Sequence, residues 1–116
     1  MRKHISKERI AQWAAIGPVL DALGSPIRQH IVMMFKPGEQ INVKSIVEQF
    51  KLSRTAVVHH INTLIEAGIL VSEKTGKGVM ISLNPEKIHQ AVCAVLRYVA
   101  DHGNPQAAST VYQDNN

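Results

Sequence analysis

The chain has 116 residues, of which 45% are hydrophobic, and this size and composition are typical of one folded domain. Its formal net charge of +4 is compatible with a polyanionic partner, and its single cysteine excludes an intramolecular disulfide and fits a reducing compartment. The sequence contains neither an apolar run of about 18 residues nor the apolar core of a secretion signal. We therefore expect a cytoplasmic protein without a membrane partner.

The N-terminal part of the chain predicts helices. Residues 6–23 have a helical period, with one apolar stripe formed by Ile10, Trp13, Ala14 and Gly17. The Gly17-Pro18 pair predicts that this segment forms either two helices or one kinked helix. Ser25-Pro26 provides an N-cap followed by a proline at the first helical position, and it predicts a helix that ends at Pro37-Gly38.

Residues 43–68 predict two helices joined by a short turn. The apolar stripe of the first helix consists of Val43, Ile46, Val47 and Phe50. Ser53 is a favourable N-cap and Gly68 a favourable stop, so we expect the second helix to run from about Arg54 to Ala67. On a helical wheel, its core-facing residues are Val57, Ile61 and Leu64, and its open polar face carries Thr55, His59, Asn62 and Glu66. By itself this pattern fits either a DNA-binding helix-turn-helix or an amphipathic hairpin with a solvated outer face.

The hydrophobic period changes after Gly68. Residues 69–74 and 79–83 predict two strands, and the intervening glycines allow a tight hairpin with Lys74 and Lys77 at its tip. Asn84-Pro85 then predicts the start of a last helix, which reaches about His102. Its apolar stripe consists of Ile88, Val92, Val95, Leu96 and Val99. The first and last helices carry more apolar surface than a small monomer can cover, and the final residues, 104–116, predict a flexible polar tail.

This order of elements predicts a mainly α fold with a small β-hairpin wing, a winged helix-turn-helix, in residues 1–103. The sequence also resembles the ArsR type of bacterial transcriptional repressors. LDALGSPIRQHIV, residues 20–32, is similar to the opening motif of that family. LSRTAVVHHINTLIEAGIL, residues 52–70, resembles its recognition-helix motif, and regulators of the MarR type share the topology. The resemblance covers roughly residues 18–100.

The resemblance implies a dimeric, sequence-specific repressor that binds double-stranded DNA at an operator of two half-sites about one helical turn apart. The homodimer would form where the first and last helices meet across a two-fold axis, through Ile10, Trp13, Val92, Val95, Leu96 and Val99. The base-reading region of the family falls on Arg54, Thr55, Val58 and His59, with Asn62 on the same face. Backbone contacts are expected from Lys44, Lys51, Ser53, Lys74 and Lys77. Val58 replaces a small hydroxyl residue usual in the family and could contact a thymine methyl group.

The metal sites of the family are not retained. Metal-sensing members place thiolates near the start of the first motif helix, where this chain has Asn42 and Lys44. Their other site uses Asp, two His and Glu on the last helix, and the corresponding residues here are Pro85, Lys87, Tyr98 and Asp101. We therefore expect no metal and no cofactor. The sequence also lacks a catalytic constellation, so we do not expect an enzyme.

Several other residues have both a structural and a functional interpretation. We expect His59 to contact DNA, His60 to pack at the helix edge and His30 to be a structural histidine. Cys93 is interpreted as a small buried hydrophobe, in preference to a redox switch. A ligand set formed by Glu86, His89 and His102 is disfavoured by its spacing. Two alternative functions remain open, namely a winged-helix module that binds protein in place of DNA and a thiol-responsive regulator that acts through Cys93.

Overall fold

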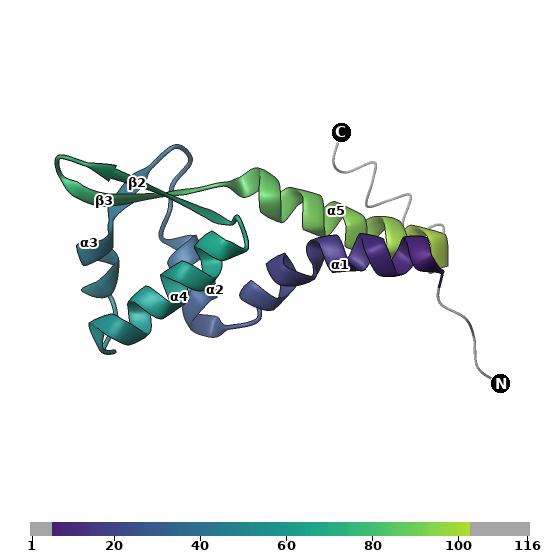
Figure 1. Cartoon of the computed structure of the whole chain (residues 1–116), viewed down its shortest axis with the longest axis horizontal. Helices are drawn as coiled ribbons and strands as arrows, with labels where there is room; N and C mark the ends of the chain where they lie inside the picture. The colour runs from purple at the N-terminus through teal and green to yellow at the C-terminus, as the bar shows by residue number, and fades with distance from the viewer. Residues whose placement is uncertain (1–5, 103–116) are drawn as a thin grey trace.

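The computed structural model describes residues 6–102, and it has a winged helix-turn-helix fold (Figure 1). The predicted tail, residues 104–116, lies outside the described residues. The elements in chain order are α1 (Lys7–Ala22), α2 (Pro26–Met33), β1 (Gln40–Asn42), α3 (Val43–Val47), α4 (Arg54–Glu66), β2 (Leu70–Thr75), β3 (Gly78–Leu83) and α5 (Pro85–His102).

The first helix is continuous. Ser6 caps it by accepting a hydrogen bond from the backbone N–H of Arg9 at 3.1 Å, and Pro18 lies inside the helix. The expectation of either two helices or a kinked one is thus resolved in favour of a single helix. Its buried residues are Ile16, Val19 and Ala22, whereas Ile10, on the predicted apolar stripe, is 56% exposed.

The core lies between α2, α3, α4 and the sheet. Its most deeply buried large side chains come from all of these elements: Ile31, Ile46, Val57, Ile61, Leu64, Ile69, Leu70 and Ile81. The predicted core stripe of α4 is therefore confirmed. Full burial of a side chain of this size contributes about 1.5–3 kcal/mol, so the three α4 residues fix which face of that helix points inward.

The sheet has three antiparallel strands in the order β1-β3-β2. The hairpin of β2 and β3 closes with Thr75 opposite Gly78, and Ile41 of β1 pairs with Ile81. Residues 40–42 were not among the predicted strands, and their pairing with β3 makes them one. The helix predicted to reach Phe50 ends at Val47, because the N–H groups of Gln49 and Phe50 bond three residues back, at 3.1 and 3.2 Å, in a tighter turn.

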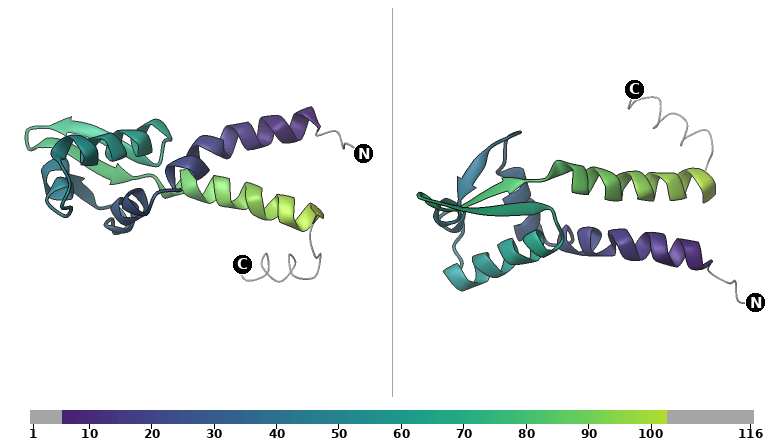
Figure 2. Two further views of the ribbon diagram at one scale, coloured as in Figure 1. Left: turned by 90° about the horizontal axis from the view of Figure 1, so that it is seen from below. Right: turned by 45° about the horizontal axis from the view of Figure 1, so that its top comes forward.

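Helices α1 and α5 pack on each other and project together from the rest of the molecule (Figures 1 and 2). We call these two helices the arm and the elements from α2 to β3 the head. Asn84, just before α5, joins them. Its side chain donates to the carbonyl of Gly68 at 3.2 Å, and its backbone N–H donates to the carbonyl of Ile69 at 2.8 Å. The C-terminal end of α4 is thereby attached to the start of the arm.

Gly68→Ala should lower the free energy of unfolding by about 1–2 kcal/mol in urea denaturation. Gly68 has a φ of +81°, which disfavours any side chain, and an added Cβ would lie 3.1 Å from Cε of Lys87. Gly76→Ala is the matched control, because Gly76 has neither a positive φ nor an atom within 4 Å of the added Cβ. Gly76→Ala should change the free energy of unfolding by less than about 0.5 kcal/mol. Equal effects of the two substitutions would contradict the view that the positive φ and the close contact at Gly68 disfavour a side chain.

Candidate nucleic-acid interface

The outer face of α4 is open to solvent over its first three turns. Ser53 caps the helix, since its hydroxyl accepts a hydrogen bond from the backbone N–H of Ala56 at 3.1 Å. The side chains predicted to read bases lie on this face and line one shallow hollow: Arg54, Thr55, Val58, His59 and Asn62. All of them are exposed except Val58, which is half-buried. The prediction that this polar face of α4 is open to solvent is therefore confirmed.

A groove of about 410 Å³ runs between α4 and the sheet. Its floor is aliphatic, with Ile61 and Ile81 among its lining residues, and Lys44 of α3 and Arg54 of α4 both border it. Figure 1 shows that α3, the start of α4 and the tip of the hairpin lie together at the end of the molecule far from the arm. Two cationic side chains from different helices thus share one rim.

The hairpin tip is held by a side chain that the sequence did not associate with it. Asn42 Oδ1 accepts from the backbone N–H of Lys44 at 2.7 Å, which caps α3. The same amide also donates through Nδ2 to the carbonyl of Lys77 at 2.9 Å. Within the turn, Thr75 Oγ1 accepts from the N–H of Lys77 at 3.1 Å. The tip, with exposed Lys74 and Lys77, is therefore tied to the start of α3.

The remaining predicted backbone-contacting residues are also exposed. Lys51 lies in the turn between α3 and α4, next to the cap residue Ser53. Together with Lys44, Lys74 and Lys77, it gives the head exposed positive charges on both sides of the start of α4. Within residues 6–102 these side chains are exposed, which is a condition for contact with a polyanion.

The two histidines predicted to be structural differ in their surroundings. His60 is partly buried at the edge of α4, as predicted, and its Nδ1 lies 3.1 Å from Nη1 of Arg28. Burial lowers the pKa of His60 below its usual value, and the charges of Arg28 and His59 lower it further. His30 is exposed, and its ring meets the ring of Phe50 at a centroid distance of 5.0 Å.

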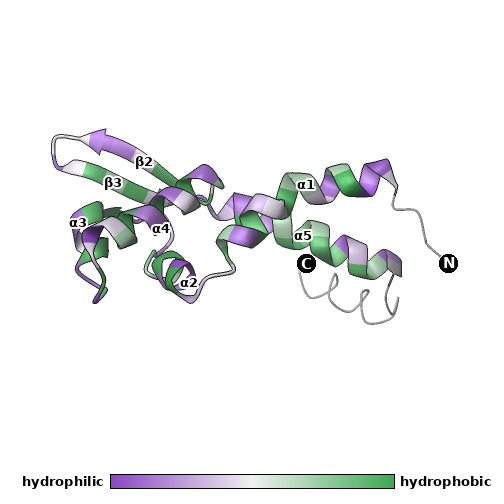
Figure 3. Cartoon of the chain, turned by 60° about the horizontal axis from the view of Figure 1, so that its bottom comes forward, coloured by the Kyte–Doolittle hydropathy of each residue, from purple (hydrophilic) through white to green (hydrophobic). Residues whose placement is uncertain are grey.

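Hydrophobic residues recur along both helices of the arm (Figure 3), and several of their side chains are exposed. Ile10 of α1 and Val92 and Val99 of α5 are 56%, 45% and 46% exposed. Trp13, Val95 and Leu96 are half-buried, and the Trp13 ring meets Tyr98 edge-on at 5.4 Å. All the residues predicted for the dimer interface thus retain accessible surface on the arm.

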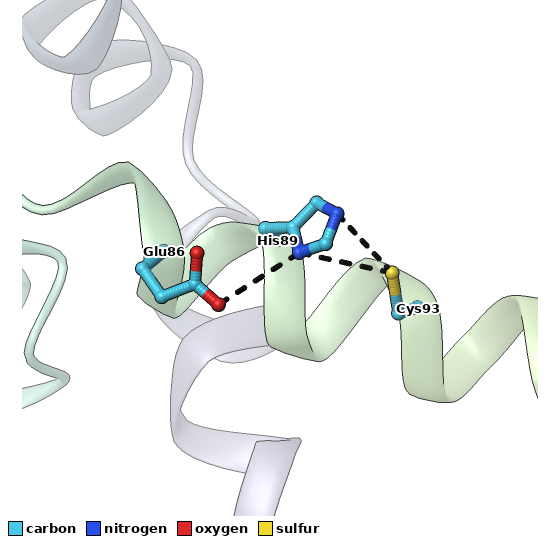
Figure 4. Close-up of polar contacts among 3 residues, drawn as sticks. All are labelled: Glu86, His89 and Cys93. Carbon is cyan, nitrogen blue, oxygen red and sulfur yellow. Dashed lines mark hydrogen bonds and ion pairs between the residues drawn. The ribbon is translucent and has the colours of Figure 1, made fainter. Parts of the chain in front are cut away.

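Cys93 is not the buried hydrophobe that the sequence suggested. It is partly exposed, since α5 packs through Ala91 on a different face of the helix. Its Sγ lies 3.5 Å from Nε2 of His89, and Nδ1 of His89 lies 3.9 Å from Oε1 of Glu86 (Figure 4). Among residues 6–102, no three or more His, Cys, Asp or Glu side chains are arranged to hold a metal ion. The side chain of His102 lies outside the described part.

In the same part of the chain, no helix is both long enough and apolar enough to cross a membrane.

Known proteins match both the sequence and the fold. The HTH domain family matches residues 27–80. The transcriptional repressor SdpR of Bacillus subtilis (strain 168) is 26% identical over 81 residues, which cover 70% of this chain and 89% of that protein.

Solved structures with the same fold include an ArsR-like transcriptional regulator from Rhodococcus sp. RHA1, with a TM-score of 0.71 and 19% identity over 89% of this chain and 94% of that one. TubR of Bacillus thuringiensis serovar israelensis, bound to 24 bp of tubC, has a TM-score of 0.51 and 19% identity over 67% of this chain and 89% of its own.

Substitutions at Ser53 should separate capping from contact with DNA. Ser53→Ala should lower the free energy of unfolding by about 1 kcal/mol, whereas Ser53→Asp keeps a capping oxygen and should retain stability. Because Ser53→Asp adds a negative charge beside the cationic face, it should still weaken DNA binding in a fluorescence anisotropy assay. Ser6→Asp is the control, because Ser6 caps α1 in the same way on the arm and should leave DNA affinity unchanged. Normal DNA affinity of Ser53→Asp would remove Ser53 from the interface.

Proposed function

We propose that this chain is an ArsR-type winged-helix transcription regulator and that it acts as a homodimeric repressor that reads an operator of two half-sites through α4. The observation that carries this proposal is the division of α4. Val57, Ile61 and Leu64 are at most 2% exposed, while the opposite face is open, and Lys44 of α3 shares with Arg54 the groove beside it. A helix of this kind can enter the major groove without unfolding any part of the head.

The residues on and around α4 divide by chemistry into two groups. Arg54 can donate two hydrogen bonds to one guanine, Asn62 can pair with an adenine, and Val58 can contact a thymine methyl group. Thr55 and His59 complete this base-reading face. The lysines and Ser53 would instead hold the phosphate backbone, which fixes the register of the complex but carries no sequence information. These are Lys44, Lys51, Lys74 and Lys77.

The arm supports the proposal of a homodimer. The exposed Ile10, Val92 and Val99 form apolar surface that a second copy of the arm could bury. Pairing of two arms about a two-fold axis would place two heads on one duplex, and two half-sites about 34 Å apart would then fit two copies of α4. We assign dimerisation to the arm and DNA binding to the head, within a single domain of residues 1–103.

The known proteins support the direction of regulation. SdpR is described as a transcriptional repressor, and TubR was crystallised with DNA. A repressor bound at its operator needs no catalytic residue, and we propose neither a metal nor another cofactor for this chain. A regulator of this kind would act on DNA in the cytoplasm.

Arg54 and Lys77 should have different roles in DNA binding. Arg54→Ala should weaken operator binding by about 1–3 kcal/mol and affect random duplex less, since a bidentate base contact is lost. Lys77→Ala should weaken both equally and reduce the salt dependence. For about 6–10 phosphate contacts, log K against log salt should have a slope of about −5 to −9 in the wild type.

The control for both variants is Lys7→Ala, at the start of the arm, which should change neither affinity. Equal losses on operator and random DNA for Arg54→Ala would refute its base-reading role. Absence of any salt-dependent duplex binding would instead favour a winged-helix module that binds protein.

Val99→Glu should dissociate the dimer, because it places a carboxylate in the apolar surface of each arm. Sedimentation equilibrium should then give the mass of a monomer, and operator affinity should fall with it. Val71→Glu is the matched control, since Val71 is 50% exposed and Val99 is 46% exposed, but Val71 lies on β2 in the head. A Val99→Glu protein that stays dimeric would place the interface elsewhere.

A further inference from the structure

One arginine side chain connects three helices at the point where the arm meets the head. Arg28 lies on α2, and its Nε donates to the carbonyl of Ala22 at 2.6 Å. Its Nη2 donates to the carbonyl of Asp21 at 3.4 Å, so the guanidinium holds the C-terminal end of α1. Its remaining nitrogen, Nη1, lies 3.1 Å from Nδ1 of His60 on α4. A single rigid group thus joins the end of the arm to the DNA-binding helix.

The contact fixes the protonation state of His60. A guanidinium only donates hydrogen bonds, so Nδ1 of His60 must accept with its lone pair and the ring proton must be on Nε2. A doubly protonated imidazole has no acceptor, and it would place a second positive charge about 3 Å from Arg28. We call the contact between Arg28 and His60 the joint. The joint can therefore form only while His60 is neutral.

We propose that Arg28 and His60 are positioning residues that hold α4 in its DNA-binding orientation relative to the arm, so that operator affinity falls when His60 takes up a proton. The proposal rests on the proposed operator binding and adds two residues outside the base-reading face. Neither residue needs to touch DNA. They act by holding α4, and with it the face that carries His59, in a fixed position relative to the end of α1.

The surroundings of His60 set the direction of the pH dependence. The charged group that faces it from α2 is Arg28, and on its own helix the ring of His59 lies 5.9 Å away between centroids. From α1 the joint receives backbone carbonyls, which carry no net charge. All the named charges therefore disfavour the protonated ring, in agreement with the lowered pKa of His60.

The lowered pKa of His60 determines how the stability of the folded protein changes with pH. As the pH falls through about 6.5, the unfolded chain binds a proton at His60 before the folded chain does. The joint therefore contributes its full stability above about pH 6.5 and loses it progressively below. Once the folded protein is also protonated, no further stability is lost.

The second connection between α4 and the arm does not titrate. Asn84 joins the start of α5 to Gly68 at the C-terminal end of α4 through an amide and a carbonyl. Loss of the Arg28–His60 contact would leave α4 attached at this end and at its buried stripe. The expected result is a folded protein in which α4 is held less firmly relative to the end of α1, and not an unfolded one.

The test compares the pH dependence of DNA binding in two proteins that differ only at residue 60. His60→Asn places an amide oxygen near the position of Nδ1, so it can accept from Arg28 but cannot titrate. Both proteins keep His59 and every other histidine, so the difference between their profiles belongs to residue 60. Operator and random duplexes are titrated by fluorescence anisotropy from about pH 7.5 to about pH 5.5.

The wild type and His60→Asn should bind the operator alike at the upper pH. At the lower pH the operator-to-random affinity ratio of the wild type should fall several-fold relative to His60→Asn, because a protonated His60 cannot accept from Arg28. Arg28→Lys keeps the positive charge, but an ammonium group cannot make the three contacts of the guanidinium. This variant should lose operator affinity already at the upper pH. Circular dichroism at each pH checks that α4 remains folded.

A nitrogen-15 NMR spectrum of the imidazole gives a readout that is independent of DNA. It should show an unprotonated Nδ1 and a proton on Nε2 for His60 at the upper pH. Parallel pH profiles of the wild type and His60→Asn, or a protonated Nδ1, would overturn the joint while leaving operator binding intact. A wild type that binds no duplex at the upper pH would instead overturn the proposed function, and the inference with it.

Discussion

The burial of one stripe of α4 is the constraint on which the rest of the structure depends. Val57, Ile61 and Leu64 are enclosed by α2, α3 and the sheet, and each contributes about 1.5–3 kcal/mol by leaving water. A rotation of α4 that buried its polar face would lose these contributions and would also leave Arg54 and Asn62 without solvent. The outward direction of the DNA-binding face is therefore a consequence of the core, and the hairpin and α3 need only flank it.

The parts of the fold that depend on local chemistry could be predicted from the sequence. Ser25 and Ser53 both cap helices through hydroxyls that accept from backbone N–H groups three residues on, and Gly68 has the positive φ of a helix end. The parts decided by distant contacts could not be predicted. Residues around Ile41 form a strand only because Ile81 lies beside them, and the second hydrogen bond of Asn42 reaches a residue 35 positions away.

In the candidate site, too, features that depend on local sequence could be predicted, and features that depend on distant contacts could not. The open face of α4 could be predicted because a helical wheel depends only on local period. The position of Arg28 could not, since it faces His60 across 32 residues and nothing in the local pattern of either helix points to the other. Cys93 was misjudged for a related reason. Residues 91–96 of α5 are all apolar and extend around the helix, so the sequence does not reveal which of its faces the neighbouring helix covers, and α1 covers only part of α5.

The two hydrogen bonds of Asn42 have a consequence for the thermodynamics of complex formation. Surface hairpins are commonly mobile in free proteins, and ordering one against a ligand costs conformational entropy. Here one amide both caps α3 and restrains the hairpin tip, so the loss of freedom at the tip occurs during folding. Preorganisation of this kind lets the lysine-bearing turn meet a nucleic acid backbone as a fixed template, with little further ordering on association.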